Sequence, residues 1–295
     1  MQDRDVTSDL QKYYPLFHEG YGTEYERFAL NRFVSRMVDR YGIHTVLEMP
    51  ANGVMGVPGI KSMIFAAAGC EVTVSHPSQE FLDNAKQVWD ALGLEATFAR
   101  SPWIGSGFGS GSFDLVWNFC VFEHFADPGE VIAEMLRVTK GCIFLQIQNI
   151  HNIGLPIHRA FHVLRSEPWD HGEPSSMDLS RLSGVIRENR GYILETGATD
   201  MPPWPDINIG LRDMLSGRKP APDMPAGPGA GLRPSVRTRD RAALIGEIRN
   251  FKRPAPKDEM VYQMFRAWYS VMETGMPFPL KRYLAHHPYI IAGKK

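Results

Sequence analysis

The stretch that decides the fold is "VLEMPANGVMGVPGIKSMIFAAAGCEVTVSHPSQ", Val46 to Gln79. It predicts an apolar strand, a loop with several glycines, a helix and a second strand. Glycine lets a backbone approach a ligand closely, and the first turn of a helix offers free N–H groups to an anion. Two details are unusual: Pro50 stands where such loops usually have their first glycine, and His76 ends the second strand where a carboxylate would be expected. We interpret the stretch as a ligand-binding unit with a modified loop.

The alternation of strand and helix continues outward from this stretch. Apolar runs predict strands at 44–49, 71–75, 95–99, 113–119, 142–149 and 191–198, and helical periodicity predicts helices at 60–69, 78–93, 127–141, 156–165 and 178–190. Such alternation implies βαβ crossovers and a parallel sheet that is covered on both faces. The predicted fold class is therefore α/β, a Rossmann-like, doubly wound, mostly parallel sheet.

Further segments flank this core. We expect an N-terminal helical cap at 1–42, the Rossmann-like domain at 43–215, a linker or lid at 216–235, and a basic helical C-terminal extension at 236–295. The linker is expected because residues 216–234 hold five prolines and four glycines. The extension carries an apolar stripe that either docks on the main domain or covers a partner subunit in a homo-oligomer: Val261, Phe265, Trp268 and Met272.

Composition narrows the classes of partner. The net charge is -1, but residues 217–295 hold 15 Lys and Arg against 6 Asp and Glu. This basic tail contains no motif in which aromatic and basic residues are interleaved as in RNA-binding proteins. We therefore expect the tail to face the acidic body of the protein and not nucleic acid. No apolar run is long enough to span a membrane and no signal peptide is visible, so we expect a cytoplasmic protein. The three cysteines stand alone in apolar sequence, as buried reduced thiols do.

The most specific motif follows the glycine loop. The segment "SFDLVWNFCVFEHFADP", residues 112–128, has Asp114 opening a strand, Glu123 and His124 after it, and an Asp-Pro pair before the next helix. In this order the segments resemble the class I S-adenosylmethionine-dependent methyltransferases, in particular the branch that acts on small molecules. The resemblance covers Val46 to Asn149 and implies S-adenosylmethionine as cofactor.

The resemblance also implies roles for residues at the strand ends. Glu48 would support the loop and the methionine amine, the loop would hold the amino-acid end of the cofactor, His76 would hold the ribose and Ser101 the adenine. The methyl group would lie against the end of the fourth strand. The implied cofactor-binding residues are Glu48, Pro50, Asn52, Gly53, Gly56, His76, Ser101, Asn118 and Phe119.

Two of these positions depart from the family pattern. His76 replaces a carboxylate that grips both ribose hydroxyls, and a neutral imidazole takes only one such hydrogen bond. Ser101 replaces an acidic side chain that meets the adenine amino group. We expect weaker cofactor binding at both positions.

His124 is the candidate catalytic base. It follows the strand whose end lines the methyl position, and an imidazole with an ordinary pKa near 6.5 accepts a proton at neutral pH. The alternative is that the Glu123–His124 pair only holds the turn.

A second group of polar residues follows the fifth and sixth strands. Four of the ten histidines fall within 21 residues, and His158 and His162 are one helical turn apart, a spacing that can bind zinc when a third ligand is supplied. No His-Glu-x-x-His pattern is present, so we predict a substrate side and no metal. The candidate substrate-binding residues are Asn149, His151, His158, His171 and Trp204.

These observations lead to one functional hypothesis and two alternatives. The hypothesis is methyl transfer from S-adenosylmethionine to a small-molecule acceptor by in-line displacement. One alternative is a methyltransferase-like binding or partner protein without transfer activity, which the changes at His76 and Ser101 motivate. The other is metal-assisted chemistry that uses the histidines between His151 and His171.

Overall fold

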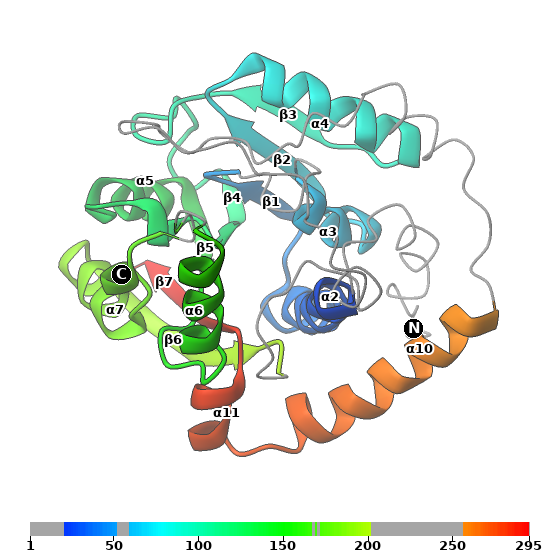
Figure 1. The fold of residues 1–295 in the computed structure, drawn as a ribbon. Coiled ribbons are helices and arrows are strands. Elements are labelled where there is room, and N and C mark those ends of the chain that lie inside the picture. Colours follow the sequence, from blue (N-terminus) through cyan, green and yellow to red (C-terminus); the bar gives the residue numbers. More distant parts are fainter. Residues whose placement is uncertain (1–20, 52–58, 167–168, 170–171, 202–255, 295) are drawn as a thin grey trace.

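The computed structural model describes residues 21–51, 59–166, 169, 172–201 and 256–294. Its centre is a seven-stranded sheet with the order β3-β2-β1-β4-β5-β7-β6 (Figure 1). All pairs from β3 to β5 are parallel, whereas β7 runs antiparallel to β5 and β6. This mostly parallel sheet confirms the predicted fold class. The strands are β1 (Thr45–Glu48), β2 (Glu71–His76), β3 (Thr97–Arg100), β4 (Phe113–Phe119), β5 (Thr139–Gln146), β6 (Gly191–Thr199) and β7 (His287–Lys294).

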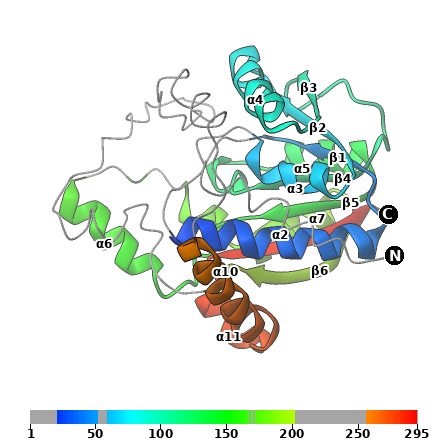
Figure 2. The same cartoon turned by 90° about the vertical axis from the view of Figure 1, so that its right-hand side faces the viewer.

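Helices cover both faces of the sheet (Figures 1 and 2). On one face lie α2 (Tyr21–Tyr41), the short pair η2 (Ile60–Ser62) and α3 (Met63–Ala67), and α4 (Gln79–Leu92). On the other lie α5 (Gly129–Val138) and α7 (Leu179–Glu188). The two faces bury separate apolar clusters because adjacent residues of each strand point to opposite sides.

Strand order reverses between β1 and β4. The chain runs from β1 outward to β2 and β3, then returns to β4 and continues to β5 on the other side. In open α/β sheets, ligands bind beyond the carboxyl ends of the strands at such a point. Figure 2 shows helix α6 (Leu155–Arg165) standing beyond this same edge.

One strand was not expected from the sequence. The sequence predicts a helical extension over 236–295, yet the segment His287–Lys294 forms β7 between β5 and β6. Its residues from His287 to Gly293 are buried, so it has no alternation of apolar and polar residues. A short apolar run of this kind is ambiguous between helix and strand, which explains the error.

The described residues of the C-terminal extension before β7 form helices, as predicted. It comprises α10 (Pro256–Trp268), the π-helical turn η5 (Tyr269–Thr274) and α11 (Phe278–Leu284). Phe265 is buried, and its ring lies 5.4 Å from that of Tyr25 and 5.9 Å from that of Phe28 on α2. The described part of the stripe therefore docks on its own domain.

Other expectations from the sequence lie outside the described residues or stay untested. The linker at 216–235 and the first part of the extension, residues 236–255, are outside the described residues, as is the Val261 side chain. The domain boundaries and the homo-oligomer remain predictions. None of the helices in the described ranges is both long enough and apolar enough to cross a membrane.

Candidate functional site

Glu48 ends β1 at the edge where strand order reverses. Its side chain is buried, and its Oε2 atom accepts a hydrogen bond of 2.5 Å from the hydroxyl of Ser62. That hydroxyl in turn accepts a 2.9 Å hydrogen bond from the indole of Trp117 on β4. The carboxylate is thus oriented by two neighbouring elements, as a group that holds a ligand amine should be.

His76 ends β2, next to Glu48 along the edge. Its Nδ1 accepts a 3.0 Å hydrogen bond from the Ser78 N–H, and its ring stacks on Phe81 at 3.9 Å. Burial lowers the pKa of His76, so the ring is neutral at pH 7. With Nδ1 acting as acceptor, Nε2 carries the proton and can donate one hydrogen bond to a hydroxyl group.

The loop after β3 presents an indole and not an acid. The Ser101 hydroxyl lies within 2.6 Å of the Ser106 carbonyl oxygen, so it is used inside its own loop. Trp103 lies edge-on to the His76 ring at 6.2 Å. Its buried Nε1 has no partner among the described residues, so this donor is available to a ligand.

The glycine loop itself is only partly described. Pro50 is buried, and the flanking Met49 and Ala51 donate N–H groups to the carbonyl oxygens of Trp117 and Ser75. Asn52, Gly53 and Gly56 lie outside the described residues.

Strand β4 ends with the two residues expected on the methyl side. They point to opposite faces. Asn118 is fully buried toward α5, where its Nδ2 lies 3.8 Å from the sulfur of Met135 and its Oδ1 has no partner in the described chain. Phe119 faces α2, and the Lys61 ammonium lies 4.2 Å from its ring centroid. These residues are therefore not placed side by side.

The turn after β4 separates the roles of Glu123 and His124. Glu123 is fully buried, its carboxylate accepts the Gln148 N–H at 3.3 Å, and burial raises its pKa to about 7. Its carbonyl oxygen accepts the Glu173 N–H at 2.8 Å. His124 is exposed on η3 (Phe122–His124). Glu123 holds the turn, whereas a catalytic role of His124 stays a hypothesis.

Asn149 is occupied by structural contacts. Its Nδ2 donates to the carbonyl oxygens of Arg282 and Ala285 at 2.8 and 2.7 Å, and its Oδ1 accepts the His151 N–H. These contacts tie the end of β5 to α11. The exposed His151 ring lies 2.9 Å from the Arg282 guanidinium. The amide of Asn149 therefore has little left for a substrate.

The histidines of α6 form a pair. The Nε2 atoms of His158 and His162 are 3.2 Å apart, and both rings pack against Trp169. These two are brought together, but His151 is not placed with them by any contact in the described chain. His171 and Trp204 lie outside the described residues.

A buried polar cluster that sequence reasoning missed lies at the same edge of the sheet. It consists of Glu26 on α2, Lys61 on η2, Asp200 after β6, and His287 at the start of β7. The Lys61 ammonium is paired with Glu26. His287 Nδ1 is 3.3 Å from Asp200 Oδ2, and its Nε2 is 3.8 Å from Glu26 Oε2.

The cluster adjoins the end of β4. The His287 ring lies 4.9 Å from the Phe119 ring, whose other neighbour is Lys61. The side-chain Oε1 of Gln146, whose backbone pairs with Phe119, is buried and has no partner in the described chain. Unpartnered buried polar atoms beside a charged cluster indicate a place where a ligand completes the hydrogen bonding.

The charge of the cluster favours a proton-transfer role over a cation site. Glu26, Asp200 and His287 each offer one ligand atom within 4.8 Å of the others, which a metal ion could use. However, Lys61 already neutralises Glu26, and a second cation would be repelled by its ammonium group. Burial lowers the pKa of His287 and Asp200 opposes this shift, so the ring is neutral at pH 7 and has a lone pair that can accept a proton.

A comparison with known families identifies a domain in the central part of the chain. The family model described as a methyltransferase domain matches residues 55–142, from the glycine loop through β4 and α5 into β5. The match covers less than half of the chain and supports a methyltransferase domain of the class that the sequence resembles. The seven-stranded order is in keeping with that class. No curated protein sequence matches the chain.

Solved structures of methyltransferases resemble the chain remotely. The putative sarcosine dimethylglycine methyltransferase from Galdieria sulphuraria is 13% identical, with a TM-score of 0.47 over 90% of this chain and 85% of that one. The magnesium protoporphyrin IX methyltransferase from Synechocystis PCC 6803, solved with bound SAH, is 16% identical, with a TM-score of 0.47 over 67% of this chain and 91% of that one. At this distance no residue role is transferred from either structure.

The residues of the polar cluster, which sequence reasoning missed, come from segments far apart in the chain. The only local signal was the apolar run after His287, which could have been taken as a strand that begins at the ligand edge. Glu26 stood in an amphipathic helix and Asp200 in a loop, and neither pattern marks a site. Only the packing of α2 and β7 against the sheet brings them together.

Proposed function

We propose that the protein methylates a small molecule at an oxygen or nitrogen atom, with His287 as general base. The class of activity, S-adenosylmethionine-dependent methylation, follows from the family. The small-molecule acceptor, the in-line displacement and the residue roles are proposals. The observation that carries them is the His287–Asp200 contact beside Phe119 at the end of β4.

The residues at the edge fit the cofactor. Glu48 would hold its amine, His76 Nε2–H one ribose hydroxyl, and the Trp103 ring and N–H the adenine side. The unpartnered indole of Trp103 supports this fit, since a buried donor requires an acceptor. When bound, S-adenosylmethionine supplies an electrophilic methyl carbon, whose bond to sulfur breaks as the acceptor lone pair bonds to it.

The chain then has to handle one proton. Asp200 opposite Nδ1 favours the tautomer with a proton on Nδ1, which leaves the lone pair of Nε2 as base. Nε2 is too far from Glu26 for a hydrogen bond, so it is not consumed by that carboxylate. The acceptor proton moves to His287 Nε2, and Asp200 stabilises the imidazolium. The 3.3 Å contact lacks hydrogen-bond geometry, and catalytic contacts without bound substrate are often poorly aligned.

Two experiments test the proposal. Calorimetric titration with S-adenosylmethionine and with S-adenosylhomocysteine should show saturable binding of both. Methyl-labelled S-adenosylmethionine incubated with a protein-free small-molecule extract should then yield a labelled product with the native protein and not with His287→Asn. Binding without any transfer to small molecules would favour the alternative of a methyltransferase-like binding protein.

A further inference from the structure

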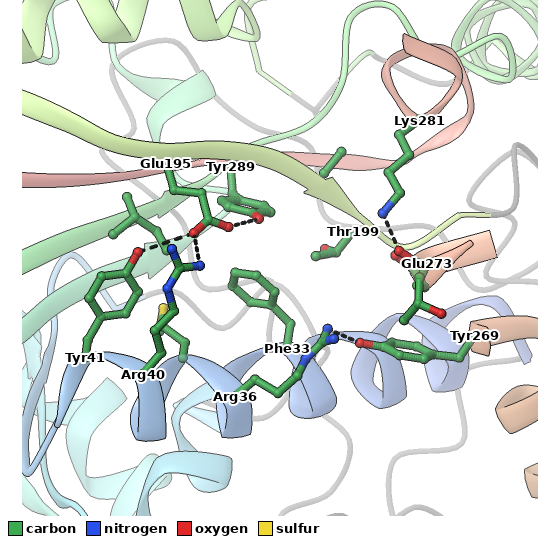
Figure 3. A pocket seen from close by; sticks show the side chains of 14 residues that line it. Phe33, Arg36, Arg40, Tyr41, Glu195, Thr199, Tyr269, Glu273, Lys281 and Tyr289 are labelled. Carbon is green, nitrogen blue, oxygen red and sulfur yellow. Dashed lines mark hydrogen bonds and ion pairs between the residues drawn. The ribbon is translucent and has the colours of Figure 1, made fainter. Parts of the chain in front are cut away.

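A pocket of about 440 Å³ lies on the α2 face of the sheet, and its lining includes Thr199, the residue before Asp200. Residues of α2 form its floor, β6 and β7 form one wall, and η5 and α11 close the other side (Figure 3). Its volume is in the range of pockets for small organic ligands. The residues that matter most are Phe33, Arg36, Glu195, Thr199, Tyr269, Glu273, Lys281 and Tyr289.

The charges at one end of the pocket are balanced. Glu195 accepts hydrogen bonds from Arg40 at 2.6 Å, from Tyr289 at 2.7 Å and from Tyr41 at 3.3 Å. One carboxylate therefore meets one guanidinium and two hydroxyls. The charge and the hydrogen-bonding capacity of Glu195 are therefore satisfied at this end without a ligand.

At the other end, two cations donate hydrogen bonds to neutral groups. Arg36 donates to the Tyr269 hydroxyl, and Lys281 donates to the backbone carbonyl of Glu273, so the acceptor is neutral in both hydrogen bonds. Figure 3 shows the two cations reaching toward this end from opposite sides. Burial lowers the pKa of Lys281; the Glu273 carboxyl group opposes this shift and Arg36 adds to it. Two cations that repel each other favour a bound anion between them.

The nearest carboxyl group does not supply that anion. The Glu273 Oε1 is turned away to accept from the Met201 N–H at 2.8 Å and the Tyr25 hydroxyl at 3.3 Å. Burial raises its pKa to about 7, so it is only partly ionised at neutral pH. Thr199 lines the same end; its hydroxyl accepts a hydrogen bond of 2.5 Å from the Gln146 amide and keeps its own proton to donate.

The walls between the two ends are flat and apolar. Phe33 and Tyr289 lie 4.6 Å apart and tilted, and Tyr269 faces the pocket from η5. Aromatic side chains pack well against another ring, and a guanidinium fork matches a carboxylate. We propose that this pocket binds a small aromatic carboxylate, with the carboxylate between Arg36 and Lys281 and the ring against Phe33 and Tyr289. This proposal does not depend on the proposed methyl transfer.

The test uses the full-length protein without cofactor and 2-naphthoate as probe. Calorimetry should give saturable binding with a Kd of about 1 mM or tighter. The uncharged isostere 2-naphthamide should bind at least about tenfold more weakly, because it lacks the charge that the two cations recognise. Arg36→Gln and Lys281→Gln should each weaken naphthoate binding by a similar factor.

Arg187→Gln is the matched control, because Arg187 is an exposed arginine on α7, on the opposite face of the sheet. It should bind naphthoate as the native protein does, and circular dichroism should show all three variants folded. Equal binding of naphthoate and naphthamide, or native affinity in Arg36→Gln, would overturn the proposal. Binding of inorganic phosphate but not of naphthoate would also overturn it, since it would indicate a simple anion site. Because no cofactor is added, failure of methyl transfer would leave these results unchanged.

Discussion

The Nδ1 atom of His287 lies 3.3 Å from Oδ2 of Asp200, although one residue starts β7 and the other follows β6. The antiparallel insertion of β7 next to β6 creates this contact, because it carries the N-terminal end of β7 to the ligand edge. An element that completes the sheet thus also places an acid–base pair beside the end of β4. The contact is the basis of the first two predictions.

Replacing His287 by Asn should reduce the rate of methyl transfer about 10²- to 10⁴-fold, the usual contribution of a general base. Binding of S-adenosylhomocysteine should change little, because the residues proposed to bind the cofactor lie at the ends of β1, β2 and β3. The measurement is kcat with labelled S-adenosylmethionine, alongside calorimetry. His124→Asn is the companion variant. A larger loss of kcat in His124→Asn than in His287→Asn would identify His124, in the turn after β4, as the base.

The pH profile should report His287 directly. Burial lowers the pKa of His287 below 6.5, so kcat/KM should rise with pH through that pKa and be level at neutral pH. Asp200 raises this pKa in the native protein, because its carboxylate favours the charged ring. Asp200→Asn should therefore shift the rise of kcat/KM to lower pH. The same substitution should also lower the value of kcat/KM on the plateau. A reduced plateau with an unmoved limb would mean that Asp200 has only a structural role.

The sequence predicted the parts of the site that are local in the chain. Glu48 and His76 follow strands that apolar runs identify, and the strand ends of a parallel sheet meet at one edge. The structure places both at that edge, while their roles toward a ligand remain proposals. Asn149 illustrates the limit of this reasoning, because its position after β5 suggested a substrate contact and its amide instead binds the backbone of α11.

The sequence could not predict the contacts that depend on how distant segments pack. Glu26 and His287 meet only because α2 lies over the sheet and β7 inserts into it. A buried run such as "YIIA" carries no alternation, so neither its type nor its neighbours could be derived from periodicity. The proximity of the two cations Arg36 and Lys281 could not be predicted for the same reason.

Glu48→Gln should weaken binding of S-adenosylmethionine roughly tenfold or more. The substitution keeps the shape and an acceptor for the Ser62 hydroxyl, but removes the charge expected to face the ligand amine. Calorimetry of the folded variant is the measurement. Glu80→Gln, at the exposed first turn of α4, changes the same charge away from Glu48 and should bind normally. If both variants bind alike, Glu48 only orients Ser62 and Trp117.

Glu123 should make the protein less stable above neutral pH. Its pKa rises from 4.5 in the unfolded chain to about 7 in the fold. Protonated Glu123 favours the fold, so this contribution is complete below about pH 4.5 and is lost as pH rises through 7. At 1.36 kcal/mol per pH unit the loss is on the order of 3 kcal/mol. Glu123→Gln should flatten the pH dependence of unfolding between pH 5 and about 8, measured by urea denaturation; an equal slope in both proteins would contradict the assignment.

His76→Asp distinguishes an adapted cofactor site from a lost one. An aspartate at this position can still accept the Ser78 N–H with one oxygen and offer the other to a ribose hydroxyl, which the neutral histidine meets only as a single donor. Binding of S-adenosylhomocysteine should therefore tighten, by about tenfold for one added charge-assisted hydrogen bond. The variant should also be less stable, because it loses the stacking of the imidazole on Phe81. Calorimetry and thermal unfolding measure the two effects separately. Weaker binding by a folded variant would mean that the His76 ring contacts a ligand in a way a carboxylate cannot replace, and the ribose role would then pass to another residue.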